Sequence, residues 1–83
     1  MTKCDKGTPG QPMFKRGDKV GFYLIPYKET KEKFFEGTVE IVDRWGTFRD
    51  PDYPSYDIMV ENYNNTGEKM LVKHVAQSEC YIL

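Results

Sequence analysis

The sequence predicts a small all-β protein, and three observations support this fold class. The chain has 83 residues, a length that allows one hydrophobic core but not two. Several short stretches alternate apolar and polar side chains with a period of two, as half-buried strands do. Turn-forming Gly, Pro and Asn residues separate these stretches, and the most helix-like segment is too short to be stable alone. We therefore expect a five-stranded β-barrel.

The first twelve residues are expected to form a flexible arm ahead of the barrel. Residues 1–12 contain two Gly, two Pro and almost no apolar side chain, so they have little surface whose burial could offset the entropy of ordering. Residues 13–83 are expected to form the single barrel domain. We find neither the apolar core of a secretory signal nor a run of about 20 apolar residues, and we expect a cytoplasmic protein without membrane contact.

The first two strands are expected at 19–25 and 34–42, on either side of a polar loop. In the first strand, the two-residue period separates Val20, Phe22 and Leu24 from Gly21, Tyr23 and Ile25. In the second strand, the same period places Phe35, Gly37, Val39 and Ile41 together on the predicted inner face.

The second half of the chain is expected to add three strands. Residues 43–54 read as a long loop rich in aromatic side chains, and residues 55–61 follow as a strand with Tyr56, Ile58 and Val60 inward. A turn then leads to a return strand ending at residue 75. Residues 76–79 suit one 3₁₀ turn, and residues 80–83 form a short last strand.

Four short segments carry a likeness to a known architecture: FKRGDKV at 14–20, EGTV at 36–39, YDIMV at 56–60 and VAQSEC at 75–80. A Gly-Asp-x-Val opening, a later Gly-x-Val and a 3₁₀ turn before the last strand are common in small barrels. The chain thus resembles the Src-homology-3-like barrels, which include Tudor and KOW modules, over roughly residues 13–83. These motifs specify architecture far better than activity.

One enzyme family has a similar Gly-Asp-x-Val opening. The type II dihydrofolate reductases are chains of similar size that form a tetramer around a pore lined by a Val-Gln-Ile-Tyr segment. The corresponding stretch here, 69–73, reads Lys-Met-Leu-Val-Lys. It lacks that hydrogen-bonding pattern and would place two ammonium groups nearby, so we do not expect this activity.

Aromatic residues in and after the 43–54 loop are the first candidate site. A flat aromatic face can bind bases, cations or proline-rich peptides, and in Tudor modules such a cage holds methylated side chains. The alternative to a binding role is a packing role, in which Trp45 and Tyr56 fill one end of the barrel. The candidate partner-binding residues are Trp45, Phe48, Tyr53 and Tyr56.

Charge supplies the second candidate site. Twelve Lys and Arg against thirteen Asp and Glu give a net charge of -1, but residues 1–33 carry eight cations and four anions. A basic rim on this segment could contact phosphates, as KOW-type barrels contact RNA. The intervening Glu29 and Glu32 favour a solvated loop instead. The candidate nucleic-acid-binding residues are Lys15, Arg16, Lys19, Lys28, Lys31 and Lys33.

The nucleophilic and metal-binding side chains are few. Cys4 and Cys80 lack the CxxC spacing of a zinc or redox site, and we expect two free thiols. His74 is the only histidine, so one chain cannot assemble a catalytic triad or a multi-histidine metal site. We expect His74 to be structural, and we expect no catalytic residue, cofactor or metal.

These observations favour a non-enzymatic protein-binding or regulatory module. Nine Lys against three Arg and a single Ala suit an AT-rich genome, which suggests an accessory protein of a bacterium, phage or mobile element. A nucleic-acid-binding barrel that uses residues 15–33 is the alternative. Self-association through an open strand edge near 80–83 is a third possibility.

Overall fold

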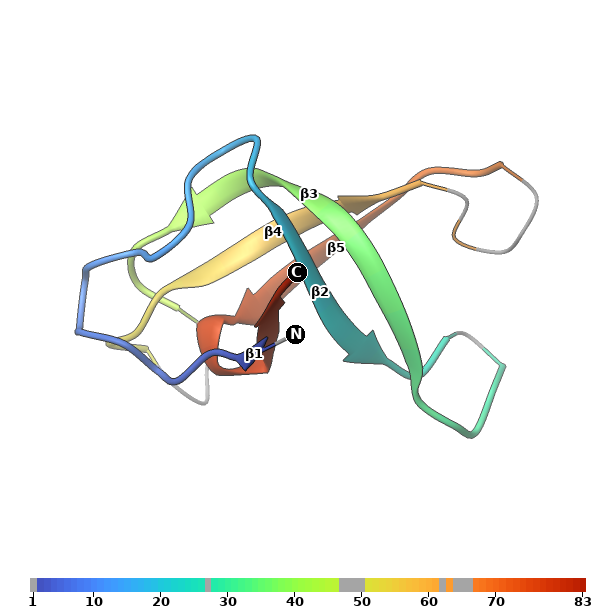
Figure 1. Cartoon of the computed structure of the whole chain (residues 1–83), viewed down its shortest axis with the longest axis horizontal. Helices are drawn as coiled ribbons and strands as arrows, with labels where there is room; N and C mark the ends of the chain where they lie inside the picture. Colours follow the sequence, from blue (N-terminus) through green and yellow to red (C-terminus); the bar gives the residue numbers. More distant parts are fainter. Residues whose placement is uncertain (1, 27, 47–50, 62, 64–66) are drawn as a thin grey trace.

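The computed structural model describes residues 2–26, 28–46, 51–61, 63 and 67–83. Almost all regular structure in these ranges is β-strand, and the strands form one antiparallel sheet (Figure 1). The one helical segment there, η1, has three residues, so no described helix is long enough to cross a membrane. The elements are β1 (Thr2–Lys3), β2 (Lys19–Leu24), β3 (Lys33–Asp43), β4 (Ser55–Val60), β5 (Met70–Ala76), η1 (Gln77–Glu79) and β6 (Cys80–Ile82).

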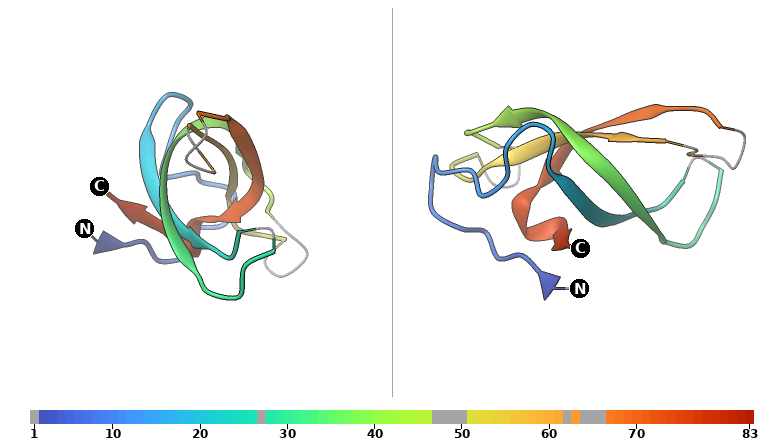
Figure 2. Two further views of the ribbon diagram at one scale, coloured as in Figure 1. Left: turned by 90° about the vertical axis from the view of Figure 1, so that its right-hand side faces the viewer. Right: turned by 45° about the horizontal axis from the view of Figure 1, so that its top comes forward.

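The all-β class, the antiparallel strands and the 3₁₀ turn before the last strand are confirmed, but the strand count and the closure are corrected. The described sheet has six strands in the order β1-β6-β2-β3-β4-β5. No ladder joins its two edge strands, so a closed five-stranded barrel is not observed in the described residues. Figure 2 shows the sheet strongly coiled, with β1 beside β6 near both termini. Alternating side chains predict which face of a strand is buried, but they do not report whether the end strands meet.

The core lies on the concave side of the coiled sheet, where the predicted inward residues gather. Val20, Val39, Tyr56 and Ile58 are each 0% exposed, and Phe22 is 1% exposed. The aromatic rings of Phe35 and Tyr63 stack with centroids 5.0 Å apart. The residues that the period-two alternation of β2, β3 and β4 placed inward therefore form most of the core.

A bulge in β3 corrects one predicted inward residue. The pairing of β3 with β4 shifts between Val39 and Ile41, so two residues of β3 span one step of β4. Val39 stays in the core, whereas Ile41 is 52% exposed. The extra residue reverses the side of the sheet that the alternation assigns to Ile41.

A second bulge lies where β4 pairs with the edge strand β5. Tyr56 is opposite Val75 and Ile58 is opposite Val72, so Asp57 faces two residues of β5. One of them, His74, has φ of 59°, the left-handed conformation that is uncommon outside Gly. Its backbone N–H donates to Asp57 Oδ1 at 3.0 Å. The His74 backbone makes this contact, and the structural role expected for the His74 side chain stays a prediction.

Residues 2–12 lie against the rest of the molecule in the structure. The extra strand, β1, pairs Thr2 with Ile82 and Lys3 with Tyr81. One residue further, the Cys4 N–H donates to the Cys80 carbonyl at 2.9 Å, and the Gly10 N–H donates to the Asp52 carbonyl at 3.1 Å. A two-residue strand carries no periodicity, which is why the sequence did not predict it.

Candidate binding surface

Tyr56, one of the four predicted aromatic contacts, belongs to the core. Its ring is wholly buried, and its hydroxyl donates to Gln77 Oε1 at 2.7 Å. The backbone N–H groups of Met13 and Phe14 donate to the same hydroxyl oxygen at 3.0 and 3.2 Å. Burial raises the pKa of Tyr56, and the Phe14 and Met13 hydrogen bonds offset part of that rise. The Tyr56 side chain therefore ties residues 13–14 to η1 and presents no face to a partner.

The other three predicted aromatic contacts do not form one described platform with Tyr56. Trp45 is 58% exposed, and its ring packs so closely on Gly10 that a Cβ atom at that glycine would lie 2.8 Å from it. Tyr53 is half-buried, with the Lys6 ammonium 5.4 Å from its ring centroid. Phe48 lies outside the described residues. Among the described members of this set, Trp45 is the one that is largely exposed.

The six predicted phosphate-contacting residues fall into two groups. All six are exposed. Lys19 starts β2, whereas Lys33 pairs with Leu24 at its far end, and five residue steps of strand span roughly 17 Å. The first group lies at the start of β2 and contains Lys15, Arg16 and Lys19. The second lies at the end of β2 and in the β2–β3 loop and contains Lys28, Lys31 and Lys33. Arg16 also lies 3.9 Å from the Glu40 carboxylate. The sheet thus separates the predicted basic rim into two ends.

A different group of aromatic side chains comes together on the outer face of β2, β3 and β6. We call Tyr23, Phe34 and Tyr81 the outer aromatic cluster. Tyr23 pairs with Phe34 across the β2–β3 ladder, with ring centroids 5.0 Å apart. Tyr81 lies 5.6 Å from Tyr23 and 5.8 Å from Phe34, and all three contacts are edge-to-face. This is the favoured geometry for aromatic pairs, so the three rings support one another on the outer face.

A glycine makes room for this cluster. Gly21 pairs with Tyr81 across β2 and β6. A Cβ atom at Gly21 would collide with the Phe34 ring and lie 2.9 Å from Leu83 Cδ2. Phe34 therefore packs down onto the backbone of β2. Beside the rings, Leu83 remains 49% exposed and Tyr23 42% exposed, so the outer face presents apolar surface that the described chain leaves uncovered.

A small hollow of about 220 Å³ opens beside the outer aromatic cluster. We call it the Tyr-Glu hollow. Two of its lining residues, Tyr23 and Tyr81, belong to the cluster. Glu32, just before β3, and Glu79, in η1, bring carboxyl groups, and Lys3 of β1 brings the one amino group. Its lining residues are Lys3, Tyr23, Glu32, Glu79 and Tyr81.

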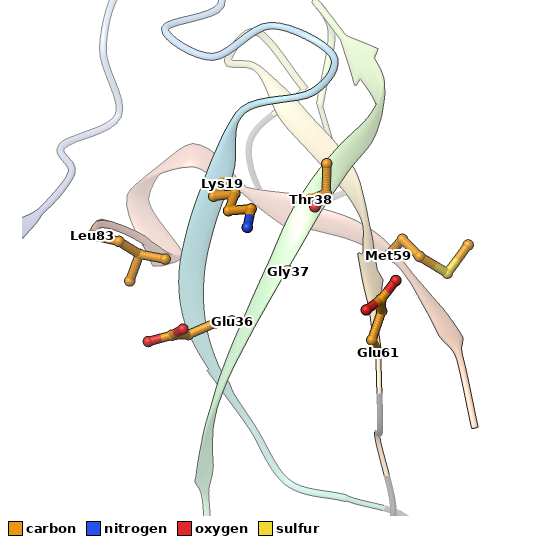
Figure 3. Close-up of a pocket in the computed structure, with 7 residues that line it drawn as sticks. All are labelled: Lys19, Glu36, Gly37, Thr38, Met59, Glu61 and Leu83. Carbon is orange, nitrogen blue, oxygen red and sulfur yellow. The ribbon is translucent and has the colours of Figure 1, made fainter. Parts of the chain in front are cut away.

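A second hollow, of about 170 Å³, lies further along the same face, over β2, β3 and β4 (Figure 3). Its lining residues include three charged ones, Lys19, Glu36 and Glu61. In Figure 3 the Glu36 side chain points away from Glu61 and Met59. Neither a histidine nor a cysteine lines this hollow, and its diverging side chains do not resemble a nucleophile held beside its base.

The two cysteines lie together in the core and both are free thiols. Cys80 is 0% exposed, and Cys4 is 8% exposed. Burial raises the pKa of the Cys80 thiol to about 12, and Cys4 and Glu79 add to the rise. Burial and the neighbouring Asp5 also raise the pKa of Cys4. Because the thiolate is the reactive form, the raised pKa values disfavour nucleophilic chemistry at these thiols. The described residues contain no cluster of three metal-ligating side chains.

Sequence reasoning placed Tyr23 on the outer side of its strand but did not identify Phe34 or Tyr81. The available signal was the run of two phenylalanines at 34 and 35, one of which must face outward in a strand. Comparison of the chain with protein-family models, with curated proteins and with solved structures found no match.

Proposed function

We propose that this protein is a non-enzymatic binding module that holds another protein on the outer face of β2, β3 and β6. The observation that carries the proposal is the outer aromatic cluster. Tyr23, Phe34 and Tyr81 come from three strands and pack edge to face on the solvent side. Aromatic residues are enriched at the centres of protein interfaces, because they bury much area and lose little conformational entropy.

Position in the sheet supports this proposal over one centred on the 43–54 loop. The strands that carry the three rings are joined by a ladder on each side of β2, and the rings pack against one another. Little rotamer freedom would therefore be lost when a partner covers them. Trp45 remains a candidate for an additional contact at the far end of β3, as its exposure allows. In this proposal the outer aromatic cluster is the main contact for the partner.

Charge around the cluster favours a protein over a nucleic acid. Glu32 and Glu79 line the hollow beside the rings, and carboxylates at this position would repel phosphates. The basic residues near 15–19 and near 28–33 lie at opposite ends of β2. Nucleic-acid binding through residues 15–33 therefore has less support, and it becomes an outcome of the test.

The strand order supports a related proposal about the fold family. We propose that the chain is a Src-homology-3-like module with an added N-terminal strand. In its support, the run β6-β2-β3-β4-β5 combines a meander with a last strand that returns to the first through a 3₁₀ turn. Five strands with a 3₁₀ turn before the last one are what the resemblance implies for residues 13–83. A cytoplasmic location and an origin in a phage or mobile element stay predictions.

The proposed function is tested by affinity capture with matched variants. The full chain is immobilised as wild type, as Tyr23→Ala/Tyr81→Ala and as Trp45→Ala, and proteins retained from a lysate of the source organism are quantified by mass spectrometry. We expect a specific partner whose recovery falls about tenfold or more with the double variant. Recovery should change far less with Trp45→Ala.

Two controls make the capture decisive. Each variant must give the same far-UV circular dichroism spectrum and a cooperative unfolding transition. A random oligonucleotide is titrated in parallel at two salt concentrations, because phosphate contacts weaken steeply as salt rises. Capture that depends on Trp45 alone, or oligonucleotide binding with a steep salt slope and no protein partner, would overturn the proposed function.

A further inference from the structure

The Tyr-Glu hollow combines aromatic rings with carboxylates in one small space. Tyr23 and Tyr81 supply the rings, and Glu32 and Glu79 supply two negative charges. Both carboxylates are exposed, and no ion pair joins either of them to another described residue. Their charges are thus available to a ligand.

The size of the hollow sets the size of the ligand. Its volume is about 220 Å³, whereas pockets for whole small molecules usually measure about 300–1,000 Å³. It also opens directly beside the outer aromatic cluster, with which it shares two rings. A single side chain that projects from a larger partner fits these dimensions better than a separate metabolite does.

The chemistry of the lining selects a cation. An aromatic face carries partial negative charge, which attracts ammonium and guanidinium groups. Carboxylates accept strong hydrogen bonds from the same groups. One like charge opposes them: Lys3, opposite Tyr81 in the β1–β6 ladder, also lines the hollow. Two carboxylates against one ammonium leave the lining with a charge of -1.

We propose that the Tyr-Glu hollow receives the cationic side chain of an Arg or Lys residue of the bound protein. This inference rests on the proposed function, because the side chain is presented by the partner that covers the outer aromatic cluster. Arginine fits best, since a planar guanidinium can stack on a tyrosine ring while its N–H groups reach a carboxylate. Glu32 and Glu79 select charge, and the rings select shape.

Lys3 gives the proposal a test of opposite sign. It lies in a strand of two residues that pairs only with β6 in the described sheet. Removing its charge eliminates the like-charge repulsion in the hollow, whereas removing a carboxylate charge eliminates attraction. A cationic ligand must therefore respond in opposite directions to Lys3→Gln and to Glu32→Gln/Glu79→Gln. An apolar or neutral ligand has no reason to do so.

The experiment titrates the isotope-labelled full chain with Nα-acetyl-arginine amide and follows backbone amide shifts by NMR. The probe control is Nα-acetyl-citrulline amide, which has a similar shape without the charge. We expect saturable shifts at Tyr23, Glu79 and Tyr81 with the arginine compound and much smaller shifts with citrulline. Affinity should fall about threefold to tenfold in Glu32→Gln/Glu79→Gln, rise severalfold in Lys3→Gln, and weaken with salt.

Each alternative outcome overturns this inference without deciding the proposed function. Equal shifts with citrulline would show that charge is not recognised. Shifts at other residues, or no change in the Glu32→Gln/Glu79→Gln variant, would exclude the hollow as the site, and absence of binding would do the same. In these cases, reduced partner capture by Tyr23→Ala/Tyr81→Ala would still support a protein-binding cluster. If that variant also captured the partner as well as wild type does, both proposals would be wrong.

Discussion

The two faces of β2 and β3 use similar residues for different purposes. Phe34 and Phe35 are adjacent in the sequence, yet Phe35 lies in the core at 6% exposure and Phe34 lies in the outer aromatic cluster. Phe22 and Tyr23 show the same contrast, at 1% and 42% exposure. Each strand therefore places aromatic rings on both sides of one sheet.

The difference between the faces lies in what surrounds the rings. Phe35 stacks on Tyr63 and is tilted against Phe22, 6.0 Å away, within a closed set of core residues. Phe34 contacts two other rings and the backbone at Gly21, but no described element covers the outer side of the sheet. Apolar area buried on the inner face stabilises the fold, whereas uncovered area on the outer face can stabilise a complex.

The largest expected effect compares the two adjacent phenylalanines. Phe35→Ala removes a buried ring and should lower the free energy of unfolding by about 3–5 kcal/mol. Phe34→Ala removes edge-to-face contacts at a half-exposed site and should lower it by about 1–2 kcal/mol. Urea unfolding followed by circular dichroism measures both values. Equal losses would show that the outer aromatic cluster belongs to the stabilising core.

A smaller effect tests how closely Phe34 packs on β2. Gly21→Ala places a methyl group against the Phe34 ring and Leu83, and overpacking of this kind should destabilise the chain by about 1–3 kcal/mol. In the Phe34→Ala background the added methyl group meets open space on that side. The cost of Gly21→Ala should then fall below about 0.5 kcal/mol in a double-mutant cycle. An unchanged cost would mean that Leu83 or β2 itself, and not the Phe34 ring, rejects the methyl group.

The third prediction concerns the inner face of β6, and the size of the expected effect depends on pH. The pKa of Cys80 is raised to about 12 from an ordinary value of 9.0, so the unfolded chain loses this proton at a lower pH than the folded chain does. Stability from this group is complete below about pH 9 and is lost as pH rises toward about 12. Within that window the loss should approach about 1.4 kcal/mol per pH unit.

The matched control for the pH dependence is Cys80→Ser, which keeps a hydrogen-bond donor near the Ala76 carbonyl but does not titrate. Lysines and tyrosines titrate in both proteins, so only the difference between their pH slopes reports on Cys80. Unfolding is measured in urea from pH 8.5 to 10.5. Parallel slopes would contradict a buried, protonated Cys80 thiol.

The all-β class and four of the strands followed from alternation in the sequence, because the inner positions of β2, β3 and β4 are apolar at every second residue. Ile41 was placed wrongly because a bulge adds a residue, and no local signal marks its position. The strand β1 was missed because two residues carry no period. The sequence did not predict that the sheet is open, because no single segment of the sequence records which distant strand it pairs with.

The candidate surface was only partly predictable for a related reason. Exposure of Tyr23 followed from its strand position, but its contact with Tyr81 depends on β2 pairing with a segment nearly 60 residues away in the sequence. The sequence prediction centred on the 43–54 loop because its aromatic residues are close together in the sequence. Tyr56 instead entered the core, as its place in an alternating strand also indicated.

The bulge between β4 and β5 has a consequence for solubility. β5 is a seven-residue edge strand, and such an edge can template polymerisation by accepting strands from other molecules. The left-handed turn at His74 breaks the regular repeat of this edge, and the His74 N–H is already held by Asp57. An incoming strand would find matching donors and acceptors over only part of β5, so the irregularity works against fibre growth.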